Sequence, residues 1–202
     1  MEEEKTRSCR TKWLGGSSGR IRHAYDGYMP FDYSRIHHRA STRLQSLDYA
    51  ATGMYFVTVC TLGKECILGE IVDGQVILNG FGRFTETALQ WLPKQYPYVT
   101  LDTYVIMPNH LHAIICITDP GGSRTAPAKR KPLGRLVGAF KTVSTKWINV
   151  MRDRPGVPIW QRNYHDRVIR DDDELHRIRR YISENPSRWA AKMTAPFANG
   201  AL

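Results

Sequence analysis

The sequence has few acidic residues, and this shortage narrows the choice of partner. Its 202 residues carry 29 Lys and Arg but only 19 Asp and Glu, which gives a formal net charge of +10 and a pI near 9.6. A surplus of this size favours a polyanionic partner, most often a nucleic acid. A basic surface that is merely solvated is the alternative interpretation.

Long apolar runs and paired cysteines are also missing. The longest apolar runs, such as 113–117, are far shorter than the ~20 residues that a membrane-spanning helix needs. The start, Met-Glu-Glu-Glu-Lys, is net acidic, whereas a signal peptide begins basic and then becomes apolar. The four cysteines form no CxxC pair, so a zinc knuckle is not indicated. We expect a cytoplasmic protein without a membrane partner, associated with the nucleoid if its partner is DNA.

The composition predicts one folded domain with extensions. With 42% apolar and 24% charged residues, the chain can form a core. Residues 1–48 have little apolar periodicity and predict a flexible basic N-terminal arm, or alternatively a loosely packed extension. The domain is expected over 49–190, with a basic linker loop at 119–132 inside it and a short tail at 191–202.

Hydrophobic periodicity predicts an α+β sandwich in which helices cover one face of a partly antiparallel sheet. Asp73-Gly74 is typical of a tight hairpin turn. Pro93 and Pro186 are expected to end or kink the helices before them. The expected strands lie at 55–61, 66–71, 75–78, 101–107, 110–117 and 159–169, and the expected helices at 84–92, 133–147 and 171–185.

His110 and His112 are the first candidates for chemistry. Residues i and i+2 of a strand project from the same face, so the two imidazoles should lie side by side while Leu111 points into the core. Two adjacent neutral imidazoles suit a divalent metal ion. Two solvent-facing histidines on a strand are the alternative.

Tyr181 and Asn185 stand four residues apart on the last expected helix, and therefore share a face that is offset from its apolar stripe. A phenol is protonated at neutral pH, so it needs a nearby cation to act as a nucleophile. A metal ion, Arg177 or Arg180 would supply that charge. The amide oxygen of Asn185 is a hard neutral ligand that suits magnesium or manganese. Alternatively, Tyr181 is an ordinary residue at the rim of an amphipathic helix.

Three motifs taken together resemble the REP-associated tyrosine transposases, a branch of the single-tyrosine HUH transposases. The motifs are YVIMPNHLH at 104–112, WQRNY at 160–164 followed by IRD at 169–171, and YISENP at 181–186. They occur in the order typical of that branch, and the resemblance extends from about Tyr49 to Trp189.

The resemblance implies a ferredoxin-like (RRM-like) fold and a metal-dependent reaction on single-stranded DNA. His110 and His112 match the family's ligands for Mg²⁺ or Mn²⁺, and Asn185 matches an additional ligand. Tyr181 matches the nucleophile, which attacks a phosphodiester and gives a 5′-phosphotyrosine and a free 3′-OH. The branch is further implied to recognise hairpins from REP-type palindromes and to act as a monomer.

One departure from the family concerns the strand after the Trp-Gln motif. Relatives often have a Glu-His pair there, whereas this chain has Asp166-Arg167. The difference puts one metal or DNA contact in doubt.

Single-stranded DNA binding requires cations and flat rings on which bases stack. Trp160, Tyr164 and Trp189 offer such rings, unless they belong to the core. The densest positive stretch runs from Arg124 to Lys146 and contains no acid. The predicted DNA contacts are Arg124, Lys129, Arg130, Lys131, Arg135, Lys141, Arg162 and Arg177.

Two other functions remain open at this point. A non-catalytic, RRM-like nucleic-acid binding module would need neither the paired histidines nor Tyr181, and would use aromatic residues on its central strands, such as Tyr55 and Phe56. A rolling-circle initiator or relaxase of the same superfamily would share the His-x-His pair but differ in the surrounding motifs.

Overall fold

A computed structural model describes residues 52–118 and 130–194, and it confirms the predicted α+β architecture. The predicted arm, most of the linker loop and most of the tail lie outside these ranges. No helix in the described ranges is both long and apolar enough to cross a membrane. The strands are β1 (Gly53–Cys60), β2 (Gly69–Val72), β3 (Gln75–Leu78), β4 (Val99–Met107), β5 (His110–Ile117) and β6 (His165–Ile169), and the helices are η4 (Leu62–Lys64), α1 (Gly80–Gln95), α2 (Leu133–Met151) and α3 (Asp172–Thr194).

Four strands form an antiparallel sheet in the order β4-β5-β1-β6. With α1 between β1 and β4, and α2 between β5 and β6, the chain follows the βαββαβ order of a ferredoxin-like fold. The short β2–β3 hairpin is inserted before α1 and forms its own two-stranded sheet. Strands β1 and β5 are therefore the two central strands, each with a neighbour on both sides.

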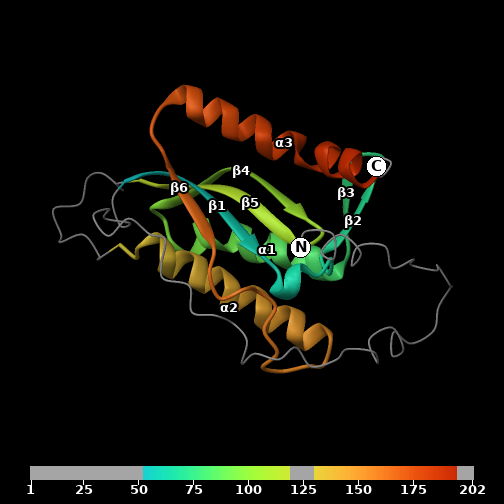
Figure 1. The fold of residues 1–202 in the computed structure, drawn as a ribbon. Coiled ribbons are helices and arrows are strands. Elements are labelled where there is room, and N and C mark those ends of the chain that lie inside the picture. Colours follow the sequence, from blue (N-terminus) through green and yellow to red (C-terminus); the bar gives the residue numbers. More distant parts are fainter. Residues whose placement is uncertain (1–51, 119–129, 195–202) are drawn as a thin grey trace, which may run out of the picture. The chain divides into compact units, whose positions relative to one another are not determined.

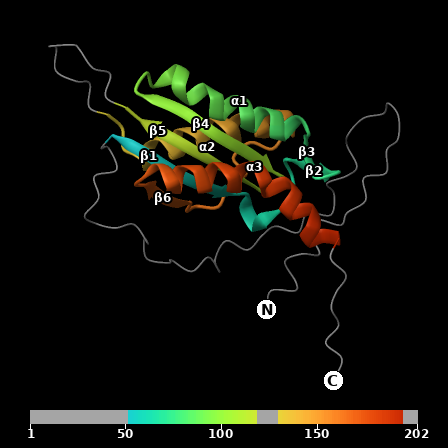
Figure 2. The same cartoon turned by 90° about the horizontal axis from the view of Figure 1, so that it is seen from above.

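Helices cover both faces of the sheet, so the expectation that they lie on one face is wrong. Figures 1 and 2 show α1 and α2 on one face and α3 on the other. The reason lies in β5, whose apolar side chains occur at both alternating positions. Leu111 and Ala113 pack with α1 and α2, whereas Ile114 and Cys116 pack with α3. A central strand that is apolar on both faces must be covered on both.

Several predicted boundaries are also wrong. Helix α1 continues past Pro93 to Gln95, and α3 continues for about two turns past Pro186. A proline removes one helical hydrogen bond, but the helix can continue where its other residues pack well. The expected strand at 159–169 is shorter because only His165–Ile169 joins the sheet, while Trp160 forms an isolated bridge with Thr61.

The predicted hairpin turn at Asp73-Gly74 is confirmed. Both residues have positive φ values, 51° and 73°, as a tight turn between antiparallel strands requires. The hairpin meets the end of α3, where the Ser187 hydroxyl donates to the Gly74 carbonyl over 3.5 Å. The small insertion is thereby tied to the helix that carries Tyr181.

Helix α3 is fixed over the sheet by a cap, an apolar stripe and an ion pair. The predicted cap is confirmed, since the Asp171 carboxylate accepts from the Glu174 amide at 2.7 Å. The predicted stripe of Leu175, Ile178 and Ile182 packs with Ile114 and Cys116 of β5 and Ile169 of β6. These residues form the second apolar cluster, on the α3 side of the sheet. Arg179 donates to both carboxylate oxygens of Asp102 on β4.

Truncating Ile182 should loosen this attachment. Ile182 is only 1% exposed, so Ile182→Ala should lower the free energy of unfolding by about 2–5 kcal/mol through lost burial and a residual cavity. Chemical denaturation measures this change. The neighbouring exposed residue gives the control, because Ser183→Ala should change stability by less than about 0.5 kcal/mol; equal effects of the two substitutions would show that α3 is not packed on the sheet as described.

Candidate active site

The alternation of β5 places His110 and His112 on the face covered by α3. In the sheet register His112 lies opposite Thr58 of β1 and Val105 of β4, and His110 opposite Cys60 and Met107. His112 is buried and His110 is half-buried. Leu111 between them is buried in the other cluster, as predicted.

The two imidazoles converge on one point. Their Nε2 atoms are 3.1 Å apart. Two nitrogen ligands bonded to one octahedral ion at about 2.1 Å and roughly at right angles would be separated by about 3.0 Å. The spacing of the histidine pair is compatible with two adjacent ligands of one divalent cation, and the burial of His112 argues against two solvent-facing histidines.

Neighbouring side chains orient both imidazole rings through contacts with their Nδ1 atoms. The Nδ1 atom of His110 is 2.7 Å from the amide oxygen of Asn109, which accepts only, so Nδ1 carries the proton and Nε2 keeps its lone pair. The orientation of that amide is fixed because its nitrogen donates to the Lys64 carbonyl at 2.9 Å. On His112, Nδ1 is 2.8 Å from the Thr58 hydroxyl, which can donate or accept. Contacts of this kind set the tautomer of metal-binding histidines.

Burial keeps both histidines neutral at pH 7. Loss of hydration lowers the pKa of His110 from 6.5 to about 4, and the charge of Lys64 adds to this effect. Loss of hydration lowers the pKa of His112 from 6.5 to about 3, with a contribution from His110. The neutral imidazole is the form that binds metal ions.

Tyr181 reaches the same point from α3. Its Oη atom is 3.4 Å from Nε2 of His112, and its side chain is 38% exposed. The prediction that it lies off the apolar stripe is confirmed. Phe56 of β1 braces both groups, because it stacks on the His112 ring at 5.3 Å and meets the Tyr181 ring edge-on at 6.0 Å.

Asn185 lies one turn further along the same face of α3. One turn beyond it, the Trp189 ring lies 5.7 Å from the His110 ring. Because Tyr181 contacts His112 and Trp189 contacts His110, Asn185 lies between them over the histidine pair. Asn185 is buried, and the described residues contain no cluster of three His, Cys, Asp or Glu that could hold a metal ion. The role of Asn185 as a neutral oxygen ligand stays a prediction.

The predicted DNA-binding cations are not gathered in one place. Arg177 is exposed one turn before Tyr181 on the same face of α3. Arg124 and Lys129 lie outside the described residues. Lys131 lies over the Tyr96 ring, at 5.1 Å from its centre. Arg130, Arg135, Lys141 and Arg162 belong to α2 or the segments that flank it, and α2 covers the face of the sheet away from Tyr181 (Figures 1 and 2).

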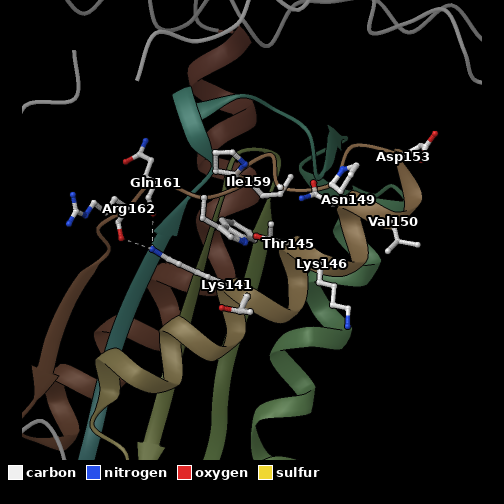
Figure 3. A pocket seen from close by; sticks show the side chains of 14 residues that line it. Lys141, Thr145, Lys146, Asn149, Val150, Asp153, Ile159, Gln161 and Arg162 are labelled. Carbon is white, nitrogen blue, oxygen red and sulfur yellow. Dashed lines mark hydrogen bonds between the residues drawn. The ribbon is translucent and has the colours of Figure 1, made fainter. Parts of the chain in front are cut away.

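Lys141 has a structural partner in this region. Its ammonium donates to the carbonyl oxygens of Gln161, Arg162 and Asn163 at 2.8–3.3 Å. Figure 3 shows Lys141 pointing toward Gln161 and Arg162. These residues also line a hollow of about 870 Å³ between α2 and residues 153–162. Three donors used inside the fold leave this cation little capacity to bind phosphate. Trp160 is 5% exposed, and its indole N–H donates to the Ser144 hydroxyl at 2.9 Å, so this ring belongs to the core.

Thr58, Lys64 and Asn109 were not predicted as members of the site, and Trp189 was predicted only as a ring for base stacking. Thr58 and Lys64 come from distant segments, and only the strand register and the turn after β1 bring them to the histidines. Asn109 directly precedes His110 in the motif at 104–112, and its side-chain amide orients the His110 ring. Trp189 follows the i, i+4, i+8 spacing from Tyr181, a signal that becomes visible once α3 continues through Pro186.

Comparisons with known proteins place this geometry in context. No protein-family model matches the chain. An uncharacterized protein of Haemophilus influenzae is 36% identical over 166 residues, which cover 76% of this chain and 91% of that protein. The chain belongs to the same family as that protein.

The solved structures show the fold. The structure of a REP-associated tyrosine transposase bound to a REP hairpin matches with a TM-score of 0.53 and 17% identity, over 75% of this chain and 74% of the other. A proposed transposase from Deinococcus radiodurans matches with a TM-score of 0.43 and 14% identity, over 71% and 96%. This chain has the fold of the REP-associated tyrosine transposase, as the sequence motifs implied.

Removing the Thr58 hydroxyl should weaken metal binding. Thr58→Val keeps the shape of the side chain but cannot fix the His112 tautomer, so we expect about 10- to 100-fold weaker Mn²⁺ affinity. Titration calorimetry measures it, with Thr58→Ser as the control that keeps the hydroxyl. Unchanged affinity in Thr58→Val would show that this contact does not orient the ligand.

The neutral histidines should also make the metal-free protein sensitive to acid. Between pH 6.5 and about 4 the unfolded chain binds protons at these two positions and the folded chain does not. Stability is therefore full above pH 6.5 and falls as the pH drops, by up to about 1.4 kcal/mol per pH unit for each histidine. Urea unfolding with chelator present should show a smaller pH slope in the double variant His110→Gln, His112→Gln. Equal slopes would contradict burial of neutral imidazoles.

Proposed function

We propose that this protein is a metal-dependent single-stranded DNA endonuclease and strand transferase, a transposase that cleaves at or near palindromic hairpin repeats. The observation that supports the proposal most directly is the convergence of three groups from distant parts of the chain. Nε2 of His112 lies 3.1 Å from Nε2 of His110 and 3.4 Å from Oη of Tyr181. A binding module would need none of the three.

Tyr181 is the proposed nucleophile. Its Oη atom attacks the phosphorus of a single-stranded phosphodiester, forming the O–P bond while the bond from phosphorus to the 3′ oxygen breaks. The phenol proton passes to solvent, and the leaving 3′ oxygen takes up a proton. The products are a 5′-phosphotyrosine and a free 3′-OH. Because the phosphotyrosine keeps the energy of the phosphodiester, the strand can be transferred to a new 3′-OH without a nucleotide cofactor.

His110 and His112, with the amide oxygen of Asn185, are the proposed ligands of Mg²⁺ or Mn²⁺. The bound ion would polarise the scissile phosphate and stabilise the charge that develops on the leaving oxygen. The protein supports this site by keeping both imidazoles neutral and by fixing their rings through Asn109 and Thr58. Phe56 limits the motion of the Tyr181 ring, which lowers the entropic cost of reaching the phosphate.

DNA hairpins of the REP type are the proposed substrate, for two reasons. The transposase that shares the fold was solved with a REP hairpin. This chain also has the large positive charge that a DNA-binding protein needs. That the protein acts as a monomer stays a prediction.

A covalent trapping assay tests the proposal. The full chain is mixed with Mn²⁺ and labelled single strands that contain the palindromes next to its gene, then separated under denaturing conditions. A protein–DNA adduct that survives denaturant is expected. Tyr181→Phe should abolish the adduct because it removes the attacking oxygen, and His110→Ala or a chelator should do the same.

Tyr104→Phe is the matched control. Tyr104 lies on β4, and its hydroxyl interacts with Gln90 and Glu86 of α1, on the face away from the histidines. This variant should form the adduct at the normal rate. Tight, salt-dependent DNA binding without any adduct would reject the enzyme and leave the binding module; an adduct that persists in Tyr181→Phe would assign the nucleophile elsewhere.

A further inference from the structure

Trp189 is the one described tryptophan without a place in the apolar core. Trp91, Trp147 and Trp160 all pack in the cluster between the sheet and helices α1 and α2. Trp189 belongs neither to that cluster nor to the one beneath α3. It is half-buried, and its recorded ring contact is with His110. A large ring without a packing role beside a candidate metal ligand calls for a different explanation.

Residues on one face of α3 make the two ends of the histidine pair chemically different. Tyr181 and Trp189 lie eight residues apart on this face, about 12 Å along the helix axis. Tyr181 lies next to His112, and Trp189 lies next to His110. Lys64 adds a positive charge on the His110 side. The histidine pair therefore has the nucleophile at one end, and an aromatic ring with a cation at the other.

The proposed function, on which this inference rests, assigns one end of the site to the attacking oxygen and the other end to the leaving oxygen. In a phosphoryl displacement the attacking and leaving oxygens lie roughly in line on opposite sides of phosphorus. With Tyr181 attacking from the His112 side, the leaving 3′ oxygen and its nucleotide point toward His110. Base–aromatic stacking is the usual way in which a protein holds an unpaired base.

We propose that Trp189 is the stacking platform for the base immediately 5′ of the cleaved bond, with Lys64 beside it to attract the adjoining phosphate. Phe56 is not available for this role, because its ring is already packed against His112 and Tyr181. Trp189 thus positions the leaving group and does not take part in bond making. It also favours substrates in which this nucleotide is unpaired.

An abasic-site walk tests the proposal in the Tyr181→Phe background, where no cleavage can occur. The probe is a labelled single strand with the palindrome next to the gene, in which each base in turn is replaced by an abasic site. Fluorescence anisotropy should show one position where base loss weakens binding by about 5- to 100-fold. In Trp189→Ala, removal of the same base should cause no further loss of affinity. In Trp189→Phe, most of the loss of affinity at that position should remain.

Two further variants separate stacking from structure. Trp189→Leu keeps an apolar side chain without a ring, and should behave like Trp189→Ala. Trp91→Ala removes a ring from the opposite side of the sheet, and should leave the effect of every abasic site unchanged. Loss of position dependence in Trp91→Ala as well, or its retention in Trp189→Leu, would overturn the stacking role.

The outcomes also distinguish this proposal from the enzymatic one. The coupled base should be the one immediately 5′ of the bond that the chain with intact Tyr181 cleaves; a coupled base on the 3′ side would overturn the assignment. A covalent adduct without any base coupled to Trp189 would reject the stacking role and keep the enzyme. Coupling without an adduct would keep the stacking but reject cleavage and the 5′ assignment, and absence of binding would reject both.

Discussion

The candidate site depends on the two-residue alternation of a central strand that is buried on both faces. In β5, Leu111 and the apolar residues at alternate positions after it complete the core beneath α1 and α2. The same alternation turns His110 and His112 to the opposite face, where α3 covers them. A shift of one residue in the register would turn both histidines into the main core and move its apolar residues to the α3 side, so folding itself enforces the position of the pair.

Helix α3 closes the second apolar cluster and also carries Tyr181, the proposed nucleophile, so one element serves both packing and the proposed chemistry. Its buried stripe fixes the rotation of the helix, and Arg179 ties it to Asp102 on β4. The face that carries Tyr181 then necessarily points at the histidines. The same burial removes water from the imidazoles and keeps them neutral, which is the form that a metal ion requires. Arg167, at the position where the family resemblance implies a histidine, pairs with Glu174 near the start of α3 and so connects the helix to β6.

The order of elements, the Asp73-Gly74 turn, the cap at Asp171 and the placing of Tyr181 away from the core could be predicted from the sequence, because each follows from local spacing or local backbone preference. What failed depended on tertiary packing. The prolines did not end α1 or α3, because side chains beyond them have partners elsewhere in the fold. Helices cover both faces of the sheet because β5 is apolar at both alternating positions; the uninterrupted apolar run at 113–117 carried this signal, but it did not show which helix covers which face. Thr58 and Lys64 reach the site only through strand pairing and a turn, which spacing along the chain does not reveal.

The net charge of the chain and the chemistry of its site act at different distances. Lys141 is bound to three carbonyl oxygens, and α2 with its basic residues lies on the face of the sheet away from Tyr181. Their charges still contribute to the field of the whole protein, which raises the rate at which a polyanion arrives but does not fix its register. The position of a bound strand along the site has to be fixed by groups on the α3 side. Arg177, Tyr181, Asn185 and Trp189 lie in one row there, and Lys64 lies in the turn after β1. Charge counted along the sequence therefore indicates a class of partner, while the proposed place of cleavage depends on a few residues that contribute little to that count.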